Sequence, residues 1–83
     1  MADELLMAIG SRVRGLREAS GASQEDFARA AGMDRAYMGK IERGAQNISI
    51  VTAAKIAAAL GLDLSALFEG VGPVDTVGGV ATD

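Results

Sequence analysis

Arg35 and Lys40 carry charged hydrogen-bond donors, and they lie in a segment that the sequence predicts to be the second of two short helices. Guanidinium and ammonium groups bind phosphate oxygens and the acceptor edges of bases, and a helix that carries them fits the major groove of DNA. The stretch 23–44 favours this arrangement, because apolar residues recur at helical spacing on both sides of a break at Gly32 and Met33. The alternative is an ordinary surface helix whose charges are only solvated.

The composition argues against an enzyme and against a metal protein. The chain has 83 residues, no histidine and no cysteine. The commonest general base, the commonest metal ligand and every disulfide or thiolate site are therefore excluded. The sequence also gives no reason to expect two carboxylates in an apolar pocket. We expect one small domain that has no catalytic residue, no cofactor and no metal ion.

The charge distribution permits a nucleic-acid partner, although the chain as a whole is acidic. Its formal net charge is −3, yet all eight basic residues lie between positions 12 and 55. That span holds five acidic residues, so its own balance is +3. Phosphate binding depends on the local field rather than on the total charge, and the acidic flanks would limit non-specific binding to DNA. The alternative is a solvated surface of mixed charge.

Five glycines divide the chain into predicted helices. Each follows an apolar run at helical spacing, where a helix C-cap favours a residue that can adopt positive φ. These glycines are Gly21, Gly32, Gly44, Gly61 and Gly70. The predicted helices cover 4–19, 24–31, 34–43, 50–60 and 64–69, with N-caps at Ser23, Asp34, Ser49 and Asp63. The predicted core includes Leu6, Ile9, Val13, Leu16, Phe27, Met38, Ile41, Ile50, Ala53, Ala57, Leu60 and Phe68. Residues 1–69 show no strand-like alternation, so the sequence predicts an all-α domain.

The last residues of the chain differ from the rest. Residues 70–83 are rich in glycine and valine, contain the single proline and lack a helical period. They are expected to form a flexible tail after a domain at 1–69, and the alternative is a strand that pairs with a partner chain. No apolar run approaches the roughly 20 residues that cross a bilayer, and the N-terminus lacks the pattern of a signal peptide. We expect a cytoplasmic protein with no membrane contact.

These residues give the chain a family resemblance. It resembles the phage-repressor and Cro type of helix-turn-helix regulator at Ser23, Gln24, Ala28, Gly32, Ile41 to Gly44, Ile56, Ala57, Leu60 and Gly61. The resemblance covers residues 5–69. It implies a compact five-helix, lambda-repressor-like domain that regulates transcription by occluding or contacting RNA polymerase. Within that group, residues 34–50 are most similar to the controller proteins of bacterial restriction–modification systems.

The resemblance assigns DNA contacts to two groups of residues. Base-reading residues are expected on the recognition helix 34–43, at Arg35, Ala36, Tyr37 and Lys40. Phosphate contacts are expected from Gln24, at the start of the preceding helix, and from Arg43 and Asn47. Ala36 and Gly39 stand where relatives often carry longer polar side chains. Arg35 is therefore expected to do most of the base reading, since its two donors match a guanine edge. The alternative for Tyr37 is packing of its ring on the core.

Two further expectations concern structure and assembly. By the same resemblance, Arg17 and Glu42 match a buried ion pair between the first and third helices, and the alternative is two exposed charges. Val51, Ala54 and Ala58 form a second apolar face on the fourth helix, which with Leu62 and Leu64 is expected to form a symmetric homodimer. Such a dimer would place two recognition helices about 34 Å apart on a palindromic operator. The alternative is a fourth helix that is rich in alanine only for its helix propensity.

The competing hypothesis for function is a protein-interaction module. An antitoxin, for example, could use the tail 71–83 as a segment that folds on its partner.

Overall fold

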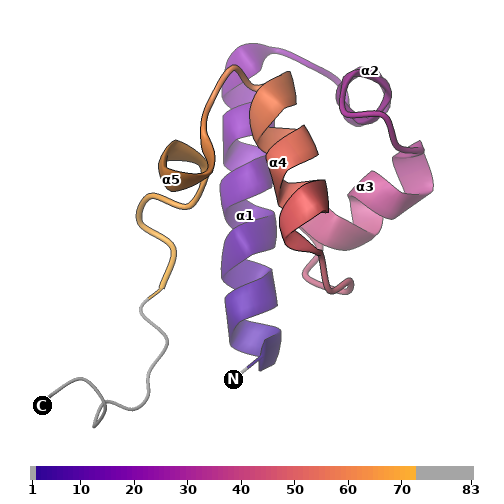
Figure 1. Ribbon diagram of the computed structural model, residues 1–83. Coiled ribbons are helices and arrows are strands. Elements are labelled where there is room, and N and C mark those ends of the chain that lie inside the picture. The colour runs from indigo at the N-terminus through magenta and orange to yellow at the C-terminus, as the bar shows by residue number, and fades with distance from the viewer. Residues whose placement is uncertain (1, 73–83) are drawn as a thin grey trace, which may run out of the picture.

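The computed structural model describes residues 2–72, and over this range the chain forms five helices and no strand (Figure 1). The helices are α1 (Ala2–Ser20), α2 (Gln24–Ala30), α3 (Arg35–Glu42), α4 (Ile50–Ala59) and α5 (Leu64–Leu67). The predicted all-α architecture is confirmed, and every helix begins and ends within two residues of its predicted bounds. Residues 73–83, which include most of the predicted tail and the segment of the antitoxin hypothesis, lie outside the described residues.

Short polar side chains and glycines set the helix ends. The side chains of Ser23, Asp34, Ser49 and Asp63 each accept a hydrogen bond of 2.8–3.0 Å from the main-chain amide three residues further on. All five glycines predicted as C-caps have positive φ, between 72° and 82°. The local sequence signals therefore fix where the helices begin and end.

All five helices contribute to one core. Val13 of α1, Phe27 of α2, Met38 of α3, Ile56 of α4 and Leu67 of α5 are each at most 3% exposed. α1 packs against α3, α3 against α2, and α4 against α5. In Figure 1, α2 and α3 lie on one side of the long helix α1, and α5 lies on the other.

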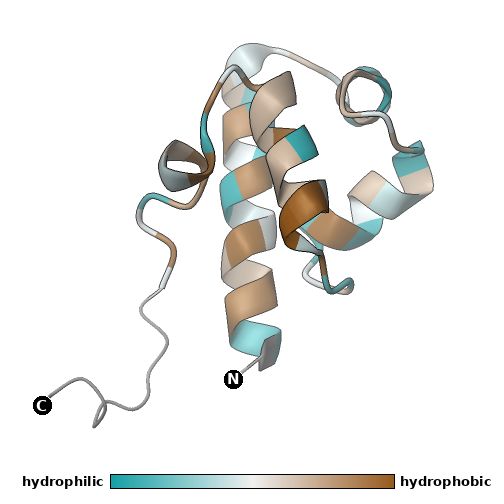
Figure 2. Ribbon diagram, in the orientation of Figure 1, coloured by the Kyte–Doolittle hydropathy of each residue, from teal (hydrophilic) through white to brown (hydrophobic). Residues whose placement is uncertain are grey.

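The core face of α4 differs from the predicted one. The sequence pattern places Ile50 in the core, but this residue is 65% exposed, so that prediction is wrong. Ile56, which is not in the predicted stripe, is fully buried together with Ala53 and Ala57. α4 is apolar on most of its sides, so its periodicity does not single out one face. Figure 2 shows the strongly hydrophobic first turn of α4, where Ile50 and Val51 are both exposed.

A close helix crossing at Gly10 sets the position of α3. A Cβ atom on Gly10 would lie 2.5 Å from the carbonyl oxygen of Ile41 and 2.6 Å from that of Glu42. Only glycine allows this approach. Arg17 lies two turns further along the same face of α1, so the crossing also brings it to Glu42.

No helix in the described range is both long enough and apolar enough to span a bilayer.

Candidate nucleic-acid interface

The turn between α2 and α3 has the hydrogen bonds of a Schellman motif. The Met33 amide donates to the carbonyl of Ala28 at 2.9 Å, and the Gly32 amide donates to that of Arg29 at 3.0 Å. Gly32 has φ +76°, which a side chain would strain. Asp34 then caps α3. These bonds set the geometry of the turn through which α3 leaves α2.

The outer face of α3 carries basic side chains. Ala36, Lys40 and Arg43 follow each other at i, i+4 and i+7, so they share one side of the helix, and all three are exposed. Arg35 is exposed at the first position of α3. Tyr37 is half-buried and packs against the core. The structure therefore exposes four of these five side chains, three of them on one side of α3, and holds the ring of the fifth against the protein.

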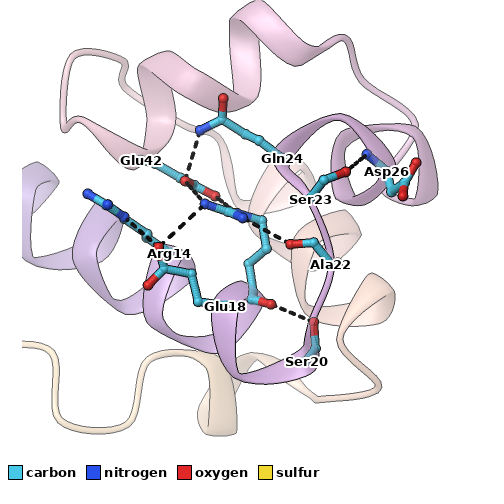
Figure 3. A network of polar contacts seen from close by, with 9 residues as sticks. Arg14, Glu18, Ser20, Ala22, Ser23, Gln24, Asp26 and Glu42 are labelled. Atoms are coloured by element: carbon cyan, nitrogen blue, oxygen red, sulfur yellow. Dashed lines mark hydrogen bonds and ion pairs between the residues drawn. The ribbon is translucent and has the colours of Figure 1, made fainter.

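Arg17 and Glu42 form a buried ion pair behind this face (Figure 3). Nε of Arg17 donates to Oε2 of Glu42 at 2.7 Å, Nη2 donates to Oε1 at 3.0 Å, and Nη1 donates to the carbonyl of Ala22 at 3.0 Å. The two side chains are only 11% and 3% exposed. The hydrogen bonds to Glu42 raise the pKa of Arg17 above its usual value, so the guanidinium stays protonated. The pair ties the end of α1, the following loop and the end of α3 together.

Gln24 belongs to the same network. Its Nε2 donates to Oε1 of Glu42 at 3.0 Å, so the side chain, for which the family resemblance implies a phosphate contact, is also bound within the protein. Glu42 can only accept hydrogen bonds. The amide nitrogen of Gln24 must therefore face Glu42, and its carbonyl oxygen points away, as Figure 3 shows.

Arg43 and Asn47 follow α3. Arg43 is its C-cap, and Nη1 of its guanidinium lies 3.2 Å from the position that a Cβ on Gly39 would occupy. The side chain is therefore folded back along α3. Asn47 is exposed in the loop before α4, and its carbonyl accepts a hydrogen bond of 3.1 Å from Gln46.

Sequence reasoning did not find the role of Arg12. Its Nε and Nη2 donate to the carbonyls of Leu67 and Ala66 at 3.0 and 2.8 Å, and so fasten the end of α5 to α1. The partners are more than fifty residues apart in sequence. No local pattern signals such a contact.

The charge on the surface of α3 follows from these contacts. Residues 35–43 contain three basic side chains and one acidic side chain, Glu42. Glu42 is buried and its charge is compensated by Arg17, so it contributes little to the field outside. The exposed face of α3 is therefore positive although the whole chain is negative. Among residues 2–72, acidic side chains form no group of three that could hold a metal ion.

The apolar residues predicted to pair two copies occupy two environments. Val51 is 62% exposed, and Ala54 and Ala58 are exposed on the same side of α4. Leu62 and Leu64 are half-buried and pack against the core. The outer side of α4 thus lacks cover within the described residues, whereas the two leucines contribute only part of their surface.

Comparison with known proteins identifies the family. The family model of the helix-turn-helix domain matches residues 8–68, which include all five helices except the first turns of α1. This chain belongs to the helix-turn-helix family. Membership assigns the protein to the DNA-binding transcription regulators, in agreement with the exposed basic face of α3.

Several relatives are restriction–modification controller proteins. The chain is 39% identical over 70 residues to the control protein C.MunI from Mycoplasma sp, an alignment that covers 83% of this chain and 95% of the relative. It is 46% identical in sequence to the restriction–modification controller protein C.AhdI from Aeromonas hydrophila. The crystal structure of that protein matches with a TM-score of 0.74, over 76% of this chain and 96% of the other. The tetramer of the controller C.Esp1396I in complex with its natural 35 base-pair operator is similar at 30% identity. Its TM-score is 0.74, over 81% of this chain and 88% of the other.

Proposed function

We propose that this protein controls transcription in a restriction–modification system by binding a palindromic operator as a symmetric homodimer, with α3 in the major groove. The observation that carries the proposal is the outer face of α3, where Arg35, Lys40 and Arg43 are exposed and the single acid is buried against Arg17. Such a face binds the negative field of DNA and offers donors to base edges. The similarity to controller proteins supports the same conclusion.

The proposed contacts divide by chemistry. Arg35 reads a guanine edge, where its fork matches O6 and N7, while Lys40, Ala36 and Tyr37 contact neighbouring bases. Asn47 and the main-chain amide of Gln24 meet phosphates and set the register of α3 in the groove. The phosphate contact of Gln24 falls to its main chain because its side-chain nitrogen is bound to Glu42.

A second copy of this chain is the proposed partner of the outer side of α4. One small domain neutralises too few phosphates for tight specific binding, and a dimer doubles that number. Val51, Ala54 and Ala58 offer an exposed apolar surface on which α4 of the second copy packs, with Leu62 and Leu64 at its edge. The related controller C.Esp1396I is seen as a tetramer on its operator. In the dimer, two recognition helices lie about one turn of DNA apart, some 34 Å.

The proposed compartment follows from the proposed partner, operator DNA. The protein works in the bacterial cytoplasm, where occupancy of the operator blocks or recruits RNA polymerase.

Two measurements test this function. DNA selected from a random pool at fixed salt is expected to contain an inverted repeat whose half-sites are centred about 10 base pairs or a multiple apart. Light scattering is expected to give the mass of a dimer at tens of micromolar protein. Enrichment of no motif would refute sequence-specific regulation, and a monomer that does not pair even on DNA would refute the dimer.

A further inference from the structure

Gly39 is buried on α3, and the side chains of Gln24 and Arg43 meet over it. We call the place where these two side chains meet the Gly39 notch. From the position that a Cβ on Gly39 would occupy, Nη1 of Arg43 is 3.2 Å away and Oε1 of Gln24 is 3.5 Å away. The absence of a side chain at Gly39 thus lets a guanidinium and an amide carbonyl approach the same point from two different elements.

The buried ion pair fixes which atom of Gln24 faces the notch. Two donors of Arg17 hold the carboxylate of Glu42, and Oε1 of that carboxylate accepts from Nε2 of Gln24 at 3.0 Å. A carboxylate cannot donate, so rotation of the Gln24 amide by 180° would set two acceptors against each other. The notch therefore presents the donors of Arg43 beside a locked acceptor, Oε1 of Gln24.

This arrangement matches the major-groove edge of one base pair. A G·C pair shows two acceptors, N7 and O6 of guanine, followed by one donor, the N4 amino group of cytosine. An A·T pair shows a donor between two acceptors, and therefore matches this order less well. We propose that Arg43 and Gln24 together read one G·C pair in each half-site. Arg43 donates to guanine, and Oε1 of Gln24 accepts from the N4 amino group of cytosine.

A phosphate contact of Arg43, as the resemblance implies, fits the notch less well. A phosphate offers only acceptors, so it would supply no donor to Oε1 of Gln24, whereas a G·C pair supplies one. The proposal thus moves Arg43 from positioning on the backbone to base readout. It rests on the proposed function, because it requires α3 to lie in the major groove.

Modified bases separate the two contacts. Each guanine of the selected half-site is replaced by 7-deazaguanine, which lacks the N7 acceptor, and each cytosine by N4-methylcytosine, which blocks the outward donor. At one base pair, 7-deazaguanine is expected to weaken binding by roughly tenfold or more, and N4-methylcytosine by about 2- to 10-fold. At the base pair where both modifications weaken binding, the 7-deazaguanine penalty should disappear in Arg43→Ala but persist in Arg35→Ala. The N4-methylcytosine penalty should disappear in Gln24→Ala.

Two controls keep this test decisive. Arg29→Ala removes the same charge at the other end of α2 from Gln24, and both penalties should remain in this variant. Gly39→Ala places a methyl group against the guanidinium of Arg43, and should reduce both penalties while its melting temperature does not fall. Gly39→Ala also carries the test if Gln24→Ala does not fold.

The outcomes that overturn the proposal differ from those that overturn the function. If Arg43→Ala weakens binding evenly, lowers the salt slope by about one and keeps the 7-deazaguanine penalty, Arg43 is a phosphate contact and the proposal fails. The proposal also fails if the N4-methylcytosine penalty survives in Gln24→Ala. Either result leaves sequence-specific binding intact, whereas a wild-type protein that selects no motif refutes the proposed function itself.

Discussion

Removal of Arg17 is expected to unfold the domain or bring it close to unfolding. In Arg17→Ala the carboxylate of Glu42, which is 3% exposed, keeps only the hydrogen bond from Gln24 and loses both bonds from the guanidinium. The carbonyl of Ala22 loses its donor as well. Leaving one partner of a buried ion pair without compensation costs roughly 3–5 kcal/mol. A domain of this size has a total stability of about 4–12 kcal/mol, so the loss takes a large part of it.

Urea and thermal unfolding followed by circular dichroism measure this loss. The expected decrease in melting temperature is roughly 12–40 °C for a chain of this length. Arg14→Ala is the matched control, because Arg14 lies on the same helix and its pair with Glu18 is exposed. That variant should lose less than about 0.5 kcal/mol. A raised arginine pKa adds stability that is present below the unfolded pKa and is lost only as the pH rises through the folded one. The contribution therefore holds throughout neutral pH.

The reasoning on burial would be refuted if Arg17→Ala melted within a few degrees of the wild type or matched Arg14→Ala. A further check removes both charges. The double variant Arg17→Met with Glu42→Leu leaves no unpaired charge and should recover much of the stability that Arg17→Ala loses.

Three other predictions follow from the packing. Gly10→Ala should destabilise the protein by about 1–3 kcal/mol or more, because its methyl group meets the carbonyls of α3. Gly15→Ala on the same helix meets nothing within 4 Å and should stabilise the protein by about 0.5–1 kcal/mol. Urea unfolding measures both changes, and two shifts of the same sign would contradict this account. Arg12→Ala should release α5, seen as faster amide hydrogen exchange at residues 64–68 than in the wild type, and unchanged exchange there would show that its two hydrogen bonds do not hold this helix. Val51→Glu should lower the fraction of dimer that light scattering measures, because it puts a charge on the proposed interface. The melting temperature of the monomer should stay nearly unchanged, since Val51 is 62% exposed. A dimer as tight as that of the wild type would place the interface elsewhere.

Local signals in the sequence predicted the helices well. Ser23 and Asp34 cap α2 and α3 through their own side chains, and Gly32 adopts the positive φ that its position requires. These features depend on residues a few positions apart, so they can be recognised without the fold.

The core of α4 and the inner contacts of the site depend on tertiary structure. The alanines of α4 leave its buried side ambiguous, so the pattern places the exposed Ile50 in the core and leaves the buried Ile56 out of it. The bond from Gln24 to Glu42 joins residues 18 apart, on two helices whose crossing angle the sequence does not give. The role of Gly10 likewise follows only once α3 is seen to cross α1 at that residue.

The most direct test of the central claim, that α3 reads the operator, compares the DNA selected by the wild type and by Arg35→Ala. At one fixed salt concentration, the wild type should enrich an inverted repeat, and Arg35→Ala should lose roughly 1–3 kcal/mol of preference at one base pair in each half-site while the other positions keep theirs. Arg29→Ala, which removes the same charge from α2, should select the wild-type motif. If Arg35→Ala selected an unchanged motif with the same preference at every position, α3 would not read DNA in the way proposed.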